Sequence, residues 1–242
     1  MKKLFILPIV LFALTLVSLT HTASAQVTQA STPTAGPTDA TTAPPANASD
    51  VGKIFCTVAG GEPLSITGPQ DATSHDYTKY HWYKLLNATG TQKEEETSMT
   101  GKTYTETLTT TGYYEYQVVT ENSNGCTSPV SDVFKVFVLP PLVPTITPLA
   151  TSICSGTGTT TLTASVTPAT GYTFTYQWTK GGAPISGATS STYTVPAETV
   201  TVNTTDTYGV TVAYSLNPTC TATATQDIIV VPVPTKPTIA AN

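Results

Sequence analysis

The sequence has few charged residues, few cysteines and nothing that looks like a helix. Asp, Glu, Lys and Arg make up 10% of its 242 residues, and the net charge of -5 includes no basic patch. Nucleic-acid binding needs such a patch, so we expect no nucleic-acid partner. The four cysteines contain no C-x-x-C pair, which argues against a metal site. No G-x-S-x-G motif holds a serine nucleophile, and no catalytic constellation is visible.

Short acidic and histidine-containing stretches do not change this conclusion. Residues 94–96 are three adjacent glutamates, which splay to alternate sides in a strand or loop, and a solvated turn is the favoured interpretation. His75, Asp76 and His81 lie close together but have no third ligand at a suitable spacing, so we take them as surface residues. We predict no catalytic residue, no metal site and no cofactor.

The N-terminus has the parts of a secretory signal peptide. A basic start precedes an apolar run over residues 4–19, and Ala23-Ser24-Ala25 forms a small-residue cleavage site before Gln26. A retained anchor needs roughly 20 apolar residues, and this run is shorter and interrupted by Pro8. We predict a signal peptide over residues 1–25, cleaved after Ala25, and a secreted or cell-surface protein with no membrane span in the mature chain.

Residues 26–50 are rich in Ser, Thr, Pro and Ala. Such a segment lacks the apolar surface that offsets the entropy of ordering a chain. We therefore predict a disordered tether that holds the folded part away from a surface.

The rest of the chain contains one pattern twice. Each copy has a cysteine, a Tyr-x-Trp, a Thr-Tyr-Thr, a Tyr that opens an alternating run, and a second cysteine twelve residues after that Tyr. The marker residues are Cys56, Trp82, Tyr114 and Cys126 in the first copy, and Cys154, Trp178, Tyr208 and Cys220 in the second. Repetition on this scale indicates two copies of one small domain, which we place at residues 51–139 and 144–233.

Short alternating segments between turn residues predict that both domains are all-β. The expected strands lie near residues 64–66, 79–85, 114–118 and 130–139 in the first copy, and near residues 162, 174–178, 208–212 and 226–233 in the second. A small domain buries a thin core, so Trp82, Trp178, Tyr114 and Tyr208 are the expected core anchors. The prolines of the linker, residues 140–143, predict a semi-rigid rod of two domains.

Four cysteines in a secreted chain imply two disulfides, with three ways of pairing them. The repeat favours Cys56 with Cys126 and Cys154 with Cys220, because these positions are equivalent in the two copies. Each second cysteine lies beyond the strand that Tyr114 or Tyr208 begins. Each bridge is therefore expected at one end of its domain.

Residues 234–239 match residues 141–146, the run that leads into the second domain. We predict that residues 234–242 resemble the start of a further repeat. Either the sequence belongs to a longer array, or the tail is a free strand able to add to a neighbouring sheet edge. Truncation or simple decay of a repeat is the favoured interpretation.

These markers resemble a known family. The order Cys, Tyr-x-Trp, Ser/Thr-Tyr-Thr, Tyr, Cys, with Ile-Cys-Ser-Gly at residues 153–156, resembles the immunoglobulin-like and PKD-like repeats of Bacteroidetes surface proteins. The resemblance covers nearly all of residues 51–233 and implies two tandem Ig-like β-sandwich domains. It departs from antibody domains, in which the second cysteine follows the corner tyrosine by two positions and the bridge crosses the core.

The two copies differ where a binding face is expected. His81, Tyr83 and Tyr113 of the first copy occupy positions that Gln177, Thr179 and Thr207 hold in the second. If one domain binds a partner we expect it to be the first, although ordinary outward strand positions are the favoured interpretation. The leading hypothesis is a non-catalytic adhesion or binding and spacer protein whose partner is an unknown protein or glycan at the cell surface. The alternative is an accessory subunit of an outer-membrane transport or enzyme complex.

Overall fold

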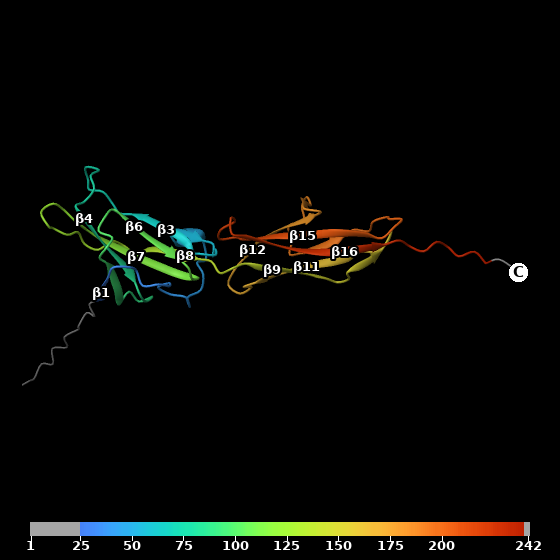
Figure 1. The fold of residues 1–242 in the computed structure, drawn as a ribbon, viewed down its shortest axis with the longest axis horizontal. Helices are drawn as coiled ribbons and strands as arrows, with labels where there is room; N and C mark the ends of the chain where they lie inside the picture. Colours follow the sequence, from blue (N-terminus) through green and yellow to red (C-terminus); the bar gives the residue numbers. More distant parts are fainter. Residues whose placement is uncertain (1–24, 240–242) are drawn as a thin grey trace, which may run out of the picture.

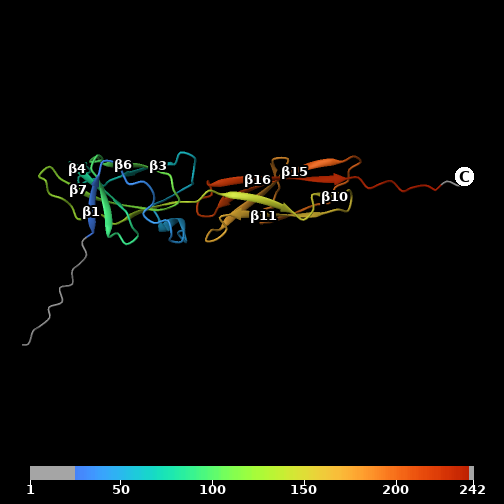
Figure 2. The ribbon, with the colours of Figure 1, turned by 60° about the horizontal axis from the view of Figure 1, so that its bottom comes forward.

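The computed structural model of the chain describes residues 25–239, so all of the predicted signal peptide except Ala25 lies outside the described residues. The described part contains sixteen strands and one short 3-10 turn, η1 (Ala48–Asp50). Figures 1 and 2 show two bodies of strands joined end to end in an elongated rod. The predicted all-β sandwich class is confirmed. Within residues 25–239, no helix is long and apolar enough to cross a membrane.

The first body is a sandwich built from β1 to β8. Its larger sheet has the order β1-β5-β4-β7-β8-β2, and its smaller sheet contains only β3 and β6. The strands are β1 (Gln26–Ala30), β2 (Lys53–Phe55), β3 (Glu62–Thr67), β4 (Lys79–Leu85), β5 (Gln92–Glu96), β6 (Thr103–Leu108), β7 (Gly112–Glu121) and β8 (Phe134–Val138). The last strand is shorter than the expected 130–139, because the chain before Phe134 follows β7 as a loop.

The second body is a sandwich built from β9 to β16. Its larger sheet has the order β10-β16-β15-β12-β13, and its smaller sheet has the order β14-β11-β9. The strands are β9 (Val143–Pro148), β10 (Ser152–Cys154), β11 (Thr160–Thr167), β12 (Phe174–Lys180), β13 (Ala183–Pro184), β14 (Thr192–Val195), β15 (Thr204–Tyr214) and β16 (Thr221–Val231). β9 begins at Val143, the last residue of the predicted linker 140–143, so little unpaired chain separates the two sandwiches.

Each sandwich buries its own apolar core around a tryptophan. Trp82 is 4% exposed and Trp178 is fully buried, and Tyr114 and Tyr208 lie in the same two cores. The Trp82 indole donates to the Gly101 carbonyl at 2.9 Å, and the Trp178 indole donates to the Ser190 carbonyl at 2.8 Å. Both carbonyls precede the Thr-Tyr-Thr strand, so each indole joins the two sheets of its sandwich in the same way.

The first core also contains a charged pair that crosses the sandwich. The Lys84 ammonium of β4 donates to a Glu106 carboxylate oxygen of β6 at 2.5 Å, and both side chains are less than 10% exposed. The hydroxyls of Tyr104 and Tyr116 donate to the other Glu106 oxygen at 2.9 and 2.8 Å. Burial, and then the nearby Glu106 charge, raise the pKa of both tyrosines, so they stay protonated donors. The pair is thus fully hydrogen-bonded rather than merely buried.

The three adjacent glutamates are the last residues of strand β5, so the prediction of a solvated turn is wrong. Glu95 points outward, whereas Glu94 and Glu96 are buried. Glu94 accepts hydrogen bonds from the Thr34 amide at 2.7 Å and from the Thr34 hydroxyl at 2.5 Å. The alternation that makes neighbouring carboxylates splay also places every second one in the core.

Residues 26–50 pack against the first sandwich, so the prediction of a disordered tether is wrong. Strand β1 pairs in parallel with β5, and Asp39 forms an isolated bridge with Tyr113. Thr38 is buried, and its hydroxyl donates to the Leu85 carbonyl at 2.7 Å and accepts from the Glu115 amide at 3.0 Å. Backbone and hydroxyl hydrogen bonds hold this segment, so its low apolar content gave no signal of order.

Replacement of Thr38 by Val should lower the free energy of unfolding of the first sandwich by about 1–3 kcal/mol, because it leaves a buried carbonyl and a buried amide without a partner. Thr28→Val on the exposed face of β1 is the matched control and should change stability by less than about 0.5 kcal/mol. Urea unfolding followed by Trp82 fluorescence, with Trp178→Phe in every chain compared, measures the difference. Equal stability of the two variants would mean that residues 26–50 do not pack as described.

Candidate functional site

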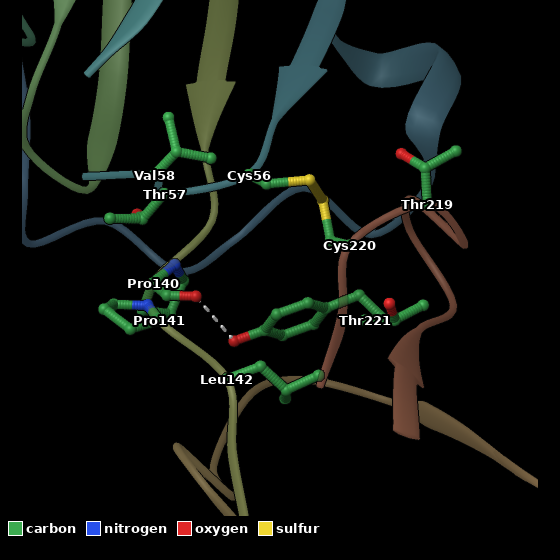
Figure 3. A pocket seen from close by; sticks show the side chains of 10 residues that line it. Cys56, Thr57, Val58, Pro140, Pro141, Leu142, Thr219, Cys220 and Thr221 are labelled. Carbon is green, nitrogen blue, oxygen red and sulfur yellow. Dashed lines mark hydrogen bonds between the residues drawn. A yellow bond between two sulfur atoms is a disulfide. The ribbon is translucent and has the colours of Figure 1, made fainter. Parts of the chain in front are cut away.

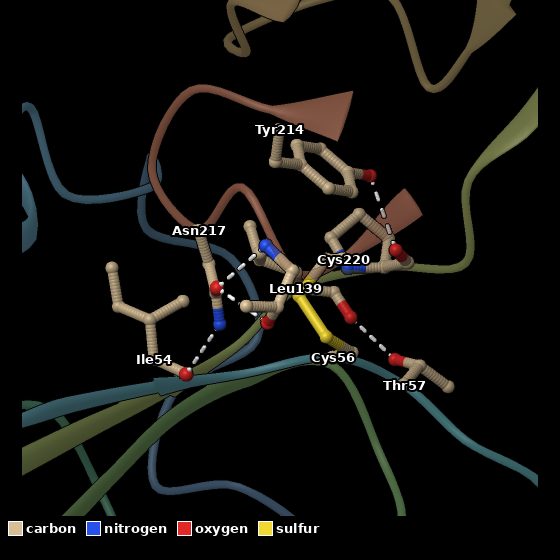
Figure 4. Close-up of a disulfide and its surroundings, with 9 residues drawn as sticks. Ile54, Cys56, Thr57, Leu139, Tyr214, Asn217 and Cys220 are labelled. Atoms are coloured by element: carbon tan, nitrogen blue, oxygen red, sulfur yellow. Dashed lines mark hydrogen bonds between the residues drawn. A yellow bond between two sulfur atoms is a disulfide. The ribbon is translucent and has the colours of Figure 1, made fainter. Parts of the chain in front are cut away.

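A disulfide joins the two sandwiches at the ends where they meet. Cys56 follows β2 of the first sandwich and Cys220 precedes β16 of the second, with their Cα atoms 5.4 Å apart (Figure 4). The Asn217 side-chain amide donates across the joint to the Ile54 carbonyl at 3.0 Å. The Tyr214 hydroxyl donates to the Pro140 carbonyl of the linker at 3.1 Å. One covalent bond and two hydrogen bonds therefore fix the second sandwich to the first.

The same joint has an apolar core of its own. Residues from both ends form this buried cluster, namely Val51, Phe137, Leu139, Tyr214 and Cys220, and Leu142 of the linker packs against it. Tyr172 and Phe174 pack their rings on Tyr214, with centroids 5.2 and 5.3 Å away. The interface between the sandwiches is thus packed like a small domain core, which restricts bending at the linker.

The predicted pairing of Cys56 with Cys126 and of Cys154 with Cys220 is wrong, because Cys56 is bonded to Cys220. Strand β7 runs ten residues, about 30 Å, from the joint toward Cys126, so Cys56 and Cys126 lie at opposite ends of the first sandwich. In the second sandwich Cys154 pairs with Val231 at the end far from Cys220. A disulfide needs Cα atoms within about 7 Å, so neither predicted bridge can form. Cys126 and Cys154 are exposed free thiols.

A cleft of about 310 Å³ lies beside the disulfide (Figure 3). Prolines, threonines, Leu142 and Tyr214 line it together with the two bonded cysteines. Its lining contains no carboxylate, histidine or lysine, so it has no group that could transfer a proton near neutral pH. Within residues 25–239, no group of three His, Cys, Asp or Glu side chains is placed to hold a metal ion. We therefore regard the cleft as part of the joint.

The outer face of β4 carries two of the three predicted binding residues. His81 and Tyr83 lie two positions apart and point to the same side. The His81 ring nitrogens lie 2.8 Å from a Glu95 oxygen and 3.2 Å from a Glu121 oxygen, and Lys79 also pairs with Glu121 at 3.1 Å. The ammonium of Lys93 lies 4.6 Å from the centre of the Tyr83 ring. The face thus combines an aromatic ring with both charged and hydrogen-bonding groups.

The charges around His81 change its titration. The hydrogen bond to Glu95 raises the pKa of His81 above 6.5, partial burial opposes this shift, and the hydrogen bond to Glu121 adds to it. The hydrogen bond from His81, followed by that from Lys79, lowers the pKa of Glu121. The histidine therefore holds its proton more firmly in the folded chain than in the unfolded chain.

Tyr113 does not join this pair. It lies at the start of β7, where its ring packs on Phe137 with centroids 4.7 Å apart. Its hydroxyl donates to the Ala43 carbonyl at 3.0 Å, so the N-terminal segment covers it. The structure thus brings together His81 and Tyr83 and assigns Tyr113 to the packing around the joint. Residues 37–43, which the sequence did not mark as packed, account for this difference.

Comparison with known proteins gives a likeness of fold only. No family model matches the chain, and no curated protein matches it. The fibronectin(III)-like modules of Clostridium thermocellum CbhA are 16% identical over 79% of this chain and 96% of theirs, with a TM-score of 0.42. The three N-terminal domains of the outer capsid protein Hoc of bacteriophage RB49 are 22% identical over 72% of this chain and 56% of theirs, with a TM-score of 0.36. A C-terminal fragment of intimin, solved with the intimin-binding domain of its translocated receptor, is 17% identical over 71% of this chain and 60% of the fragment, with a TM-score of 0.35.

Peptide mapping without reductant should find Cys56 linked to Cys220, and iodoacetamide should label Cys126 and Cys154 without prior reduction. Cys220→Ser should lower the free energy of unfolding by about 2–5 kcal/mol, whereas Cys154→Ser should leave it nearly unchanged. A peptide that links Cys56 to Cys126 would contradict this assignment.

His81→Gln should flatten the dependence of stability on pH. Because the folded-state pKa of His81 lies above its unfolded value, protonated His81 stabilises the fold below about pH 6.5, and this contribution is lost as the pH rises through the folded-state pKa. Urea unfolding at a series of pH values between about 5 and 8 measures the effect, with His75→Gln at an exposed position as the control. The proposed pairing is wrong if Glu95→Gln leaves the His81 pKa, followed by NMR, unchanged.

Proposed function

We propose that the chain is a secreted or cell-surface, non-catalytic protein that acts as a binding and spacer module in adhesion. This proposal rests on the packed interface between the two sandwiches. A disulfide, an apolar cluster and two hydrogen bonds fix two sandwiches end to end, which is the mechanical property that a spacer needs. A rod of this kind presents its outer sandwich at a constant distance and orientation.

The outer face of β4 is the proposed binding surface. The Tyr83 ring offers an apolar face, while Glu95 and His81 offer hydrogen-bond acceptors and donors beside it. Such a combination suits a glycan, whose C–H groups pack on aromatic rings and whose hydroxyls hydrogen-bond to polar side chains. The second sandwich has Gln177 and Thr179 at the equivalent positions, so the aromatic platform belongs to the first sandwich alone.

The relationship to Bacteroidetes PKD-like surface proteins and cleavage after Ala25 remain predictions. An export signal would agree with the disulfide, because structural disulfides persist outside the reducing cytoplasm. The intact mass of the protein recovered from its native envelope or medium tests the cleavage site directly.

A glycan array probed with the purified chain tests the binding proposal. Tyr83→Ala should reduce binding at least about tenfold, whereas Thr179→Ala at the equivalent place in the second sandwich should not. Absence of binding to any glycan, together with co-purification in a stoichiometric outer-membrane complex, would replace the adhesion proposal by the accessory-subunit alternative.

A further inference from the structure

A lysine and a glutamate are in direct contact in the core of the first sandwich. Lys84 comes from β4 of the larger sheet and Glu106 from β6 of the smaller sheet, and their side chains are 2% and 8% exposed. The Lys84 nitrogen lies 2.5 Å from Oε1 of Glu106, so the Glu106 carboxyl carbon is at most about 3.7 Å from that nitrogen. This separation is close to the distance at which an amine and a carboxyl carbon react.

Two tyrosine hydroxyls hold the other oxygen of this carboxylate. Tyr104 and Tyr116 donate to Oε2 of Glu106 at 2.9 and 2.8 Å, and Oε1 is the oxygen in contact with the lysine. Attack of an amine on the carboxyl carbon places negative charge on Oε2. Donors that already point at the oxygen where charge develops stabilise such an intermediate without any rearrangement.

The surroundings of the pair exclude water. Tyr104, Tyr114 and Tyr116 are fully buried in the same core, and the Lys84 nitrogen lies 5.1 Å from the centre of the Tyr114 ring. Transfer of one proton from the ammonium to the carboxylate removes both buried charges and leaves a nucleophilic amine beside a carboxylic acid. The exclusion of water also protects an amide formed here from hydrolysis.

A second buried carboxylate is placed to carry a proton. Glu94 of β5 lies directly opposite Lys84 in the β4–β5 ladder, and its side chain is also buried. Such cross-strand neighbours share a face of the sheet, with their Cβ atoms about 5 Å apart. Thr34 contacts both side chains, because its carbonyl accepts from the Lys84 nitrogen at 2.6 Å and its hydroxyl donates to Glu94 at 2.5 Å.

We propose that Lys84 and Glu106 condense to an amide, so that an isopeptide bond joins the two sheets of the first sandwich. The neutral Lys84 nitrogen attacks Cδ of Glu106, and the new C–N bond leaves the negative charge on Oε2. Glu94 takes a proton from the nitrogen and passes it to Oε1, which already carries the proton that came from the ammonium. The Cδ–Oε1 bond then breaks and Oε1 leaves as water, so the reaction needs no oxidant and no other reactant.

The hydrogen bonds around the pair suit the product as well as the ion pair. The amide oxygen is Oε2, which keeps the hydroxyls of Tyr104 and Tyr116 as donors. The amide N–H keeps the Thr34 carbonyl as its acceptor. A neutral amide with both groups paired is less costly to bury than an ammonium and a carboxylate, so the packing of this core favours the product.

The second sandwich provides an internal control. Lys180 of β12 has the place that Lys84 has in β4, two positions after the core tryptophan. Ala183 and Val195 stand where the first sandwich has its two buried glutamates. The side chain of Lys180 is 37% exposed and pairs with Glu198 and Asp206. Water reaches this lysine and no core carboxylate faces it, so we expect Lys180 to stay unmodified.

Mass spectrometry of the purified full chain is the deciding measurement. After reduction and alkylation of the cysteines, the chain should be lighter than its sequence, counted from its determined N-terminus, by the mass of one water molecule. Trypsin should fail to cut after Lys84 and should release residues 80–93 joined to residues 103–135, whereas it should cut after Lys180. A folded wild-type chain that keeps its full mass and is cut after Lys84 overturns the proposal.

Variants test the role of each group. Lys84→Arg and Glu106→Ala should keep the full mass, whereas the matched control Lys180→Arg should still lose one water. Glu94→Gln can keep both hydrogen bonds to Thr34 and should slow the loss of water at least about a hundredfold.

Rapid cross-linking of folded Glu94→Gln would show that Glu94 only supports the structure and would overturn its role as the proton carrier. The wild-type mass decides the main proposal even if Lys84→Arg or Glu106→Ala fails to fold. The bond lies in the core and Tyr83 on the outer face, so the result does not depend on glycan binding.

Discussion

The bond between Cys56 and Cys220 is the constraint on which the arrangement of the chain depends. It closes a loop of 164 residues, which contributes about 5 kcal/mol in the chain-entropy treatment. Two small sandwiches joined by a short linker would otherwise be expected to move relative to each other. The bond instead holds the two ends in contact, and the apolar cluster around Tyr214 packs between them. Loss of the disulfide would therefore remove the covalent link between the two sandwiches and also weaken the packing at their interface.

A second constraint acts inside the first sandwich. A buried ammonium and carboxylate are unfavourable unless every polar atom finds a partner. Lys84 meets this requirement with Glu106 and with the Thr34 carbonyl, which comes from the N-terminal segment. The Thr34 amide and hydroxyl also satisfy Glu94. The segment therefore stabilises the first core through polar contacts and cannot be treated as a leader that the domain could lose without effect.

The sequence predicted the repeated sandwich well because the evidence for it is local. The Tyr-x-Trp strands and the runs after Tyr114 and Tyr208 alternate with the period of a strand, and both tryptophans lie in a core. The predicted cysteine pairing was wrong because the observed disulfide depends on how the two copies stack, which neither copy's sequence shows. Repeat equivalence suggests bonds within each domain, whereas end-to-end stacking brings the start of the first copy's sheet to the hairpin turn of the second. Order in residues 26–50 was missed because hydroxyls and backbone, not apolar side chains, provide its contacts.

The chain segment that precedes each sandwich packs in a different place in the two copies, and this explains why their smaller sheets differ. Chain that precedes the second sandwich becomes β9 and completes the smaller sheet beside β11. Chain that precedes the first sandwich instead satisfies buried charges and extends the larger sheet beside β5. One segment cannot occupy both places, so the polar core of the first sandwich and the open edge of β3 have a common origin. An open edge normally invites unwanted pairing. Pro63 and Pro69 have no backbone amide, so they limit such pairing to a short stretch around Ser65 and Thr67.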